Sequence, residues 1–261
     1  MRSILVILLL AASSITAGAQ TLWRGRATTS NLGIEFLKPS FTDRNAGYTG
    51  LVTTLSAGFA LGSATAIVVE IPLIFSSYSS FSSYDESALG NPYFGLQLGP
   101  AGSDIFGDLG VRVPMIGETQ QLSGGLATLT DINRFEAYVP HLFQISGALN
   151  VDKRIAPTLR LLARLGPSAD FSTLGGNADL YADYGLTLEL VQDELTLGAG
   201  YSARTLLSVG VIEDRTVDEI AVGGYFRFER IEPGLQARFP MDEYMRRQLS
   251  FVYGLSVRLL L

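Results

Sequence analysis

The stretch that decides the fold is residues 249–261, which read L-S-F-V-Y-G-L-S-V-R-L-L-L. Every second residue from Leu249 is apolar, whereas the positions between them include Ser250, Gly254, Ser256 and Arg258. Side chains alternate between the two faces of a strand, so one face of this segment is entirely apolar. The segment is long enough to cross a bilayer, which takes about 9–11 tilted residues. It therefore predicts a membrane-spanning β-strand.

The start of the chain predicts export. Arg2 precedes an apolar run, and Ala17-Gly18-Ala19 has the small-x-small pattern of a signal-peptide cleavage site. The apolar run is shorter than the roughly 20 residues that a spanning helix needs. We expect a signal peptide at residues 1–19, a periplasmic N-terminal segment at 20–30 and one barrel domain at 31–261.

Composition supports a barrel and excludes several function classes. Hydrophobic residues make up 47% and charged residues 17% of the chain, yet after the signal no apolar run approaches a transmembrane helix. Alternating barrel strands produce this combination. The net charge of −6 without basic blocks argues against nucleic-acid binding. With no Cys, one His and no phosphate-binding loop, the sequence indicates neither a cofactor nor a metal site.

Alternating segments recur along the whole chain. We predict an all-β, transmembrane, antiparallel up-and-down β-barrel of about twelve strands, with ten or fourteen as alternatives. The odd-numbered connections are the longer ones, as expected for outer loops. The predicted strands are 31–42, 50–60, 64–75, 91–98, 106–116, 137–151, 157–166, 178–190, 195–209, 219–228, 231–239 and 249–261.

The polar face of these strands is predicted to line the lumen. The chain has only two Lys, Lys38 and Lys153, against seventeen Arg, and Arg can pair bidentately with carboxylates in a fixed network. A soluble periplasmic protein with the faces reversed is the alternative. The charges could cross-link the interior, line a channel or bind a polar solute; pairing is favoured because unpaired buried charges are costly. The predicted lumen-lining residues are Glu35, Glu70, Arg112, Arg160, Arg164, Asp183, Glu189, Arg204, Glu219, Arg227, Arg238 and Arg258.

Three neighbouring segments carry a family resemblance. V-V-E-I-P-L-I-F (68–75), G-N-P-Y-F-G-L-Q-L (90–98) and G-D-L-G-V-R-V-P-M-I-G (107–117) resemble the outer-membrane barrels associated with meta-pathway phenol degradation and transport. The resemblance covers about fifty residues. It implies a barrel with a passive transport role and supplies no substrate.

Two connections stand out. Residues 76–88 are rich in Ser with Tyr78, Phe81 and Tyr84 between them, which suits the aromatic girdle at the outer interface or an adaptable binding surface. Asp85 and Glu86 are interpreted there as solvated turn residues. The longest connection, residues 117–136, is either a plain mobile loop or holds a short helix over 126–135 at the mouth.

Catalysis has one His candidate, His141. The residue that would share its face two positions later is Phe143 rather than a Ser, so we predict no enzyme activity. The sequence favours an outer-membrane channel or passive transporter for small solutes in a Gram-negative-type bacterium. The alternative is a structural or surface-binding barrel with a plugged lumen and no transport. The expected partners are outer-membrane lipid, the barrel insertion machinery and a small-molecule solute.

Overall fold

The computed structural model describes residues 25–42, 47–79, 83–208 and 216–261. The predicted signal peptide and the mature start at Gln20 lie outside these residues. The described strands are β1 (Asn31–Phe41), β2 (Tyr48–Ala60), β3 (Thr65–Ser79), β4 (Ser83–Leu89), β5 (Tyr93–Leu98), β6 (Ile105–Arg112), β7 (Leu142–Ala156), β8 (Leu159–Ser172), β9 (Asp179–Gln192), β10 (Leu195–Leu206), β11 (Thr216–Phe226), β12 (Ile231–Pro240) and β13 (Leu249–Leu260).

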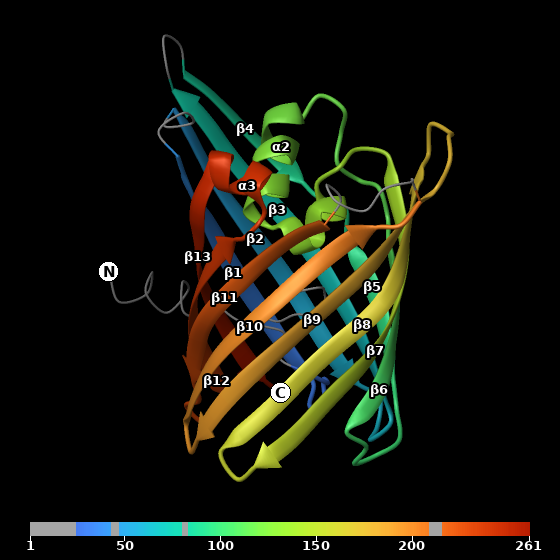
Figure 1. The fold of residues 1–261 in the computed structure, drawn as a ribbon, viewed down its shortest axis with the longest axis vertical. Coiled ribbons are helices and arrows are strands. Elements are labelled where there is room, and N and C mark those ends of the chain that lie inside the picture. Colours follow the sequence, from blue (N-terminus) through green and yellow to red (C-terminus); the bar gives the residue numbers. More distant parts are fainter. Residues whose placement is uncertain (1–24, 43–46, 80–82, 209–215) are drawn as a thin grey trace.

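The strands close into one antiparallel barrel (Figure 1). β1 pairs with both β2 and β13, and the remaining strands pair in sequence order. β4 and β5 both pair with β3, β4 along residues 73–79 and β5 along residues 65–70. They therefore share one place in the wall, and the barrel has the predicted twelve places.

The break between β4 and β5 follows from the sequence Gly90-Asn91-Pro92. Pro cannot donate a ladder hydrogen bond, so a strand is interrupted there. The amide of Gly90 still donates to the carbonyl of Pro72 on β3, at 2.9 Å. The side chain of Asn91 is fully buried and bonds to the connection that follows β6.

Apolar side chains point outward and charged side chains inward, the reverse of a soluble barrel. On β13, Leu255 is 53% exposed, whereas the inward Arg258 holds an ion pair with Glu232 at 2.5 Å. The same pattern holds on β8, where Leu165 is exposed and Arg164 pairs with Asp108 inside. The outer wall is thus suited to contact hydrocarbon, in agreement with the predicted face assignment.

The two ends of the barrel differ. One end has short turns, such as residues 193–194 between β9 and β10, and the other carries the longer connections and the helices (Figure 1). The helices are α2 (Gln121–Thr130), the 3₁₀ helix η2 (Ile132–Ala137) and α3 (Glu243–Gln248). No described helix is long and apolar enough to cross a membrane.

Residues 76–88 were expected to be a loop, and this expectation is wrong for the described part. β3 runs on to Ser79, and β4 begins at Ser83 and pairs with it. In the register of this hairpin Tyr78 lies opposite Tyr84, and the ring of Tyr78 also lies 4.6 Å from that of Tyr48 on the neighbouring strand β2. Glu86 is not a solvated turn residue, because its carboxylate accepts the amide of Ser123 at 2.6 Å. Phe81 lies outside the described residues.

The boundaries around the longest connection also differ from the prediction. β6 ends at Arg112, before Pro114, and β7 begins at Leu142 rather than at Ala137. The intervening residues turn into the barrel as α2 and η2, which extend beyond the predicted helix over 126–135. Of the two alternatives for this connection, the helical one is correct.

Candidate functional site

All twelve predicted lumen-lining residues take part in ion pairs. Eight of the twelve are buried, and Arg227, near a short turn, is the most exposed, with 54% of its side chain accessible. The pairs among or including these residues are Glu35–Arg134, Glu35–Arg238, Glu70–Arg112, Glu70–Arg134, Arg112–Glu136, Arg160–Asp152, Arg160–Glu189, Arg164–Asp108, Asp183–Arg204, Arg204–Glu136, Glu219–Arg238, Arg227–Glu232 and Arg258–Glu232.

The centre of the network is a segment that we call the plug, residues 131–137, formed by Asp131 and η2. Its Arg134 is 1% exposed, and its Nη1 donates to Glu35 on β1 at 2.8 Å and to Asp131 at 2.6 Å. The Nε of Arg134 lies 3.7 Å from Glu70 on β3. The plug is therefore fixed to the inner wall by charge rather than by apolar packing alone.

Asp131 joins the plug to a further strand of the wall, β12. Its second oxygen accepts from Arg238 on β12 at 2.8 Å, and Tyr138 donates to the oxygen that Arg134 contacts, at 3.0 Å. Burial alone would raise the pKa of Asp131, but the guanidinium groups of Arg134 and Arg238 hold it below its ordinary value of 3.8. Asp131 is thus a carboxylate in the neutral pH range.

Two further plug residues reach the strands on the far side. The carboxylate of Glu136 accepts from Arg204 on β10 at 2.6 Å and lies 3.6 Å from Arg112 on β6. Asn133 accepts from Ser202 at 3.0 Å and donates to Glu219 on β11. The plug consequently contacts β1, β3, β6, β10, β11 and β12 and spans the lumen.

α2 and Asn91 hold the plug in place. α2 packs Ala127 into an apolar cluster with inward residues of β1–β4 and β13, including Leu37, Val52 and Ile74. The amide group of Asn91 donates to the carbonyls of Glu136 and Val139, and its oxygen accepts the amides of residues 115 and 116. Asn91 thereby ties both ends of the connection to the wall.

A second group of ion pairs lies toward the end with the short turns. Arg160 contacts Asp152 at 2.6 Å and Glu189 at 3.0 Å. Several residues of this region line a polar cavity of about 350 Å³, which also includes turn residues such as Asp193. This end of the barrel therefore has a polar recess.

Residues 25–30, which we call the strap, cross this end of the barrel. Gly25 lies against the side chains of Asp152 and Arg160 on β7 and β8, while the strap leads directly into β1 on the opposite side. Arg26 donates to the carbonyls of Ser63, Gly99 and Pro100 in two short turns.

The inner wall also contacts the strap through Gln97, whose oxygen accepts the amide of Ala27 at 2.9 Å. Plug and strap thus contact the inner wall toward the two ends of the lumen.

Some residues of the network were missed in the sequence. Asp108 and Asp152 lie on strands at inward positions, so their alternation with outward apolar neighbours could have identified them. Asp131, Arg134 and Glu136 lie in a long connection, where no periodicity relates a residue to the lumen. Asn91 was missed because a single Asn beside a Pro is typical of an ordinary turn.

His141 lies at the rim with the longer connections. Its Nε2 is 2.6 Å from Glu118, and its Nδ1 is 3.3 Å from the hydroxyl of Thr173. All three side chains lie at the surface of the described chain, outside the charge network. No group of three His, Asp or Glu side chains that could hold a metal ion occurs among the described residues.

Solved structures with a similar fold are outer-membrane barrels. An outer-membrane channel from Pseudomonas putida F1 matches with a TM-score of 0.61 and 13% identity, covering 95% of this chain and 100% of that chain. The NanC porin matches with a TM-score of 0.56 and 7% identity, over 88% of this chain and 100% of that chain. The translocator domain of the autotransporter NalP from Neisseria meningitidis matches with a TM-score of 0.56 and 15% identity, over 89% and 88%.

These identities are low enough that the likeness shows the fold alone. No protein-family model matches the sequence, and no curated protein matches it. The chain therefore has the fold of outer-membrane β-barrels, and its function has to be argued from its own lumen.

Proposed function

We propose that the protein is an outer-membrane channel for small polar solutes, closed in the described conformation by the plug and the strap. The polar cavity of about 350 Å³ at the short-turn end carries this proposal, because it provides a polar space at one mouth of the barrel that a purely structural role does not require. The apolar outer wall, the predicted signal peptide and the fold support an outer-membrane location, reached through the barrel insertion machinery.

The polar contacts between the plug and the wall support a gating role for the plug. The plug places the side chains of Asn133, Arg134 and Glu136 in the lumen, and the wall residues that they contact are polar. Removing the plug would leave a lumen lined by positively charged Arg side chains and negatively charged carboxylates. Such a lining suits small polar solutes better than apolar ones.

The alternative function is a plugged barrel with a structural or surface-binding role. It is favoured by the deep burial of the charge network, in which Arg134 and Arg238 are 1% and 0% exposed. A network so well buried resists opening, since separating a buried pair leaves charges without partners.

Planar-bilayer recordings distinguish the two functions. Residues 131–137 are replaced by Gly and Ser at equal length. The connection between β6 and β7 then keeps its length but loses the plug side chains. As a matched control, α3 (243–248), which is at the same end but shares no ion pair with the network, receives the same treatment. We expect low conductance from the parent and the α3 variant, and a clear increase from the plug variant. A folded plug variant as silent as the parent would reject the channel and favour the structural role.

A further inference from the structure

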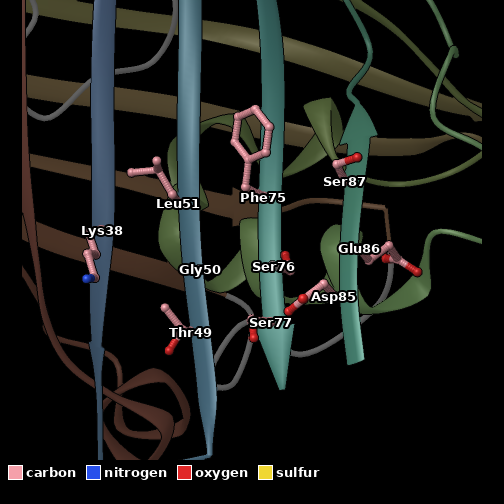
Figure 2. A pocket seen from close by; sticks show the side chains of 10 residues that line it. All are labelled: Lys38, Thr49, Gly50, Leu51, Phe75, Ser76, Ser77, Asp85, Glu86 and Ser87. Carbon is pink, nitrogen blue, oxygen red and sulfur yellow. The ribbon is translucent and has the colours of Figure 1, made fainter. Parts of the chain in front are cut away.

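A groove on the outer wall of the barrel is not explained by the channel. It has a volume of about 530 Å³ and lies over β1, β2, β3 and β4 near the end with the longer connections (Figure 2). Its lining includes Lys38, Leu51 and Phe75, and the hydroxyl-bearing or acidic residues Thr49, Ser77 and Asp85. In Figure 2 the strands that carry these residues lie in front of the helices, which fill the interior.

The strand register divides the lining into two rows. Leu51 pairs with Phe75, which pairs with Ser87, and this row is apolar at its centre. One step nearer the rim, Thr49 pairs with Ser77, which pairs with Asp85. The groove therefore has an apolar side and a polar side.

The two rows lie where the outward residues of the wall change from apolar to polar. Farther from the rim, the outward residues of β2 and β3 are apolar, as with Leu55 and Ile71, which are 37% and 38% exposed. Toward the rim, the outward residues of β3 and β4 are Ser77, Ser79, Ser83 and Asp85. A barrel wall changes in this way where hydrocarbon gives way to lipid headgroups.

Lys38 places a positive charge at this boundary. It is exposed on the outward face of β1 and forms no ion pair with any described residue. Asp85 stands at the other end of the groove, three strand spacings away, which is about 14 Å at about 4.8 Å each. The two charges are too far apart to neutralise each other, so the groove is cationic at one end and acidic at the other.

We propose that the groove binds the phosphorylated sugar headgroup of an outer-leaflet glycolipid. A phosphate contacts Lys38, since a lysine ammonium is a compact partner for phosphate oxygens. Sugar hydroxyls donate to the carboxylate of Asp85 and exchange hydrogen bonds with Thr49 and Ser77. The start of an acyl chain covers Leu51 and Phe75. This inference rests on the outer-membrane location and orientation of the proposed function.

Native mass spectrometry of the detergent-purified full chain tests the proposal. The probe is a purified diglucosamine glycolipid with two phosphates, compared with the same lipid after enzymatic removal of its phosphates. The variant is Lys38→Gln, and the matched control is Lys153→Gln, the other lysine, which lies on the short-turn side and pairs with Asp104 at 3.5 Å. Unboiled and boiled samples on a detergent gel establish that both variants are folded.

We expect Lys38→Gln to weaken binding of the phosphorylated lipid about tenfold, the usual scale of one charge-assisted contact. Lys153→Gln should change it less than about twofold, since no phosphate contacts that side chain. Removing the phosphates should weaken binding to the parent by the same factor and have no further effect on Lys38→Gln. Asp85→Asn should weaken both lipids equally, because it acts on the sugar.

Three results would overturn the proposal. The first is equal binding by Lys38→Gln and the parent, and the second is an equal loss in Lys153→Gln, which would indicate unspecific charge attraction. The third is displacement of the lipid by millimolar inorganic phosphate, which would indicate a site for the free ion. Conductance of the plug variant is recorded from the same preparations. Lipid binding by a silent plug variant would support the groove and reject the channel, whereas conductance without lipid binding would overturn the groove alone.

Discussion

The arginines at the centre of the network should contribute most to the stability of this barrel, because they are almost fully buried and little solvent screens their charge. Arg134 forms ion pairs with three carboxylates, those of Glu35, Glu70 and Asp131. Arg227, in contrast, is about half exposed and forms an ion pair with Glu232. Glu232 also pairs with Arg258, so it would retain one cationic partner if Arg227 were replaced. Loss of a side chain should therefore cost far more at the centre of the lumen than at its edge.

We expect Arg134→Gln to destabilise the folded barrel by about 3–5 kcal/mol, since carboxylates would be left buried without their cation. Arg227→Gln should cost less than about 1 kcal/mol, as is usual for an exposed ion pair. The measurement is unfolding in detergent, followed by the shift from folded to unfolded mobility on a gel. Equal effects of the two substitutions would show that the network does not carry the stability assigned to it.

Asp131 gives the plug a defined response to acid. Because its folded pKa is below 3.8, its contribution to stability is complete above that value and is lost as the pH falls through the folded pKa. The groups that interact with it are Arg134, Arg238, Tyr138, Glu35, Glu70 and Glu219, of which the arginines stay charged throughout. Lowering the pH from 7 to about 4 should thus leave this contribution unchanged.

The chain has no Cys, so one introduced at the buried Ala127 of α2 reports opening of this region. Its reaction with a dithiodipyridine, which modifies thiols in acid, should stay slow down to about pH 4 and accelerate below pH 3.8. In an Asp131→Asn background the acceleration attributable to this carboxylate should disappear. Acceleration between pH 7 and pH 5 would contradict the assignment, as it would require a group with a higher pKa.

At the scale of elements, the sequence was most informative where alternation is regular. β8 to β13 begin within three residues of their predicted starts, because turn residues such as Asp193 separate long alternating runs. The β3–β4 hairpin was missed because the Ser-rich residues that pair in it, 76–79 with 83–86, show no apolar alternation.

The plug shows a different limit. Its position in the lumen is fixed by Asn91, by ion pairs to five strands and by a hydrogen bond to a sixth, and no local pattern in residues 131–137 encodes such distant contacts. The inward charged residues of the wall could be predicted from the sequence. Their charged partners in the plug could not. Even so, the excess of Arg over Lys indicated that fixed pairs would be found.

The connection between β8 and β9 gives a test of orientation. It includes Gly175 and Gly176, which are exposed, have positive φ values of 96° and 119° and have open space around them, so an insertion is tolerated there. A tag between them should be labelled on intact cells, and a tag beside Asp193 only after the outer membrane is permeabilised. Reversed labelling would show that the long connections face the periplasm.

At the scale of the whole molecule, plug and strap close the same lumen in series. The plug acts at the end with the long connections through Arg134, and the strap acts at the end with the short turns through Arg26. For two obstructions in series, the narrower one limits the current. Opening either end alone should therefore release only part of the conductance of an open barrel.

Arg26→Ala removes the hydrogen bonds to the carbonyls of Ser63, Gly99 and Pro100 and should loosen the strap without disturbing the strands. Combined with the Gly-Ser plug, it should raise single-channel conductance by more than the sum of the two separate increases. Arg230→Ala, which changes an exposed arginine in the short turn between β11 and β12 that forms no ion pair with described residues, is the matched control and should add nothing to the plug variant. If Arg26→Ala also adds nothing, the strap is no obstruction, and the plug alone closes the channel.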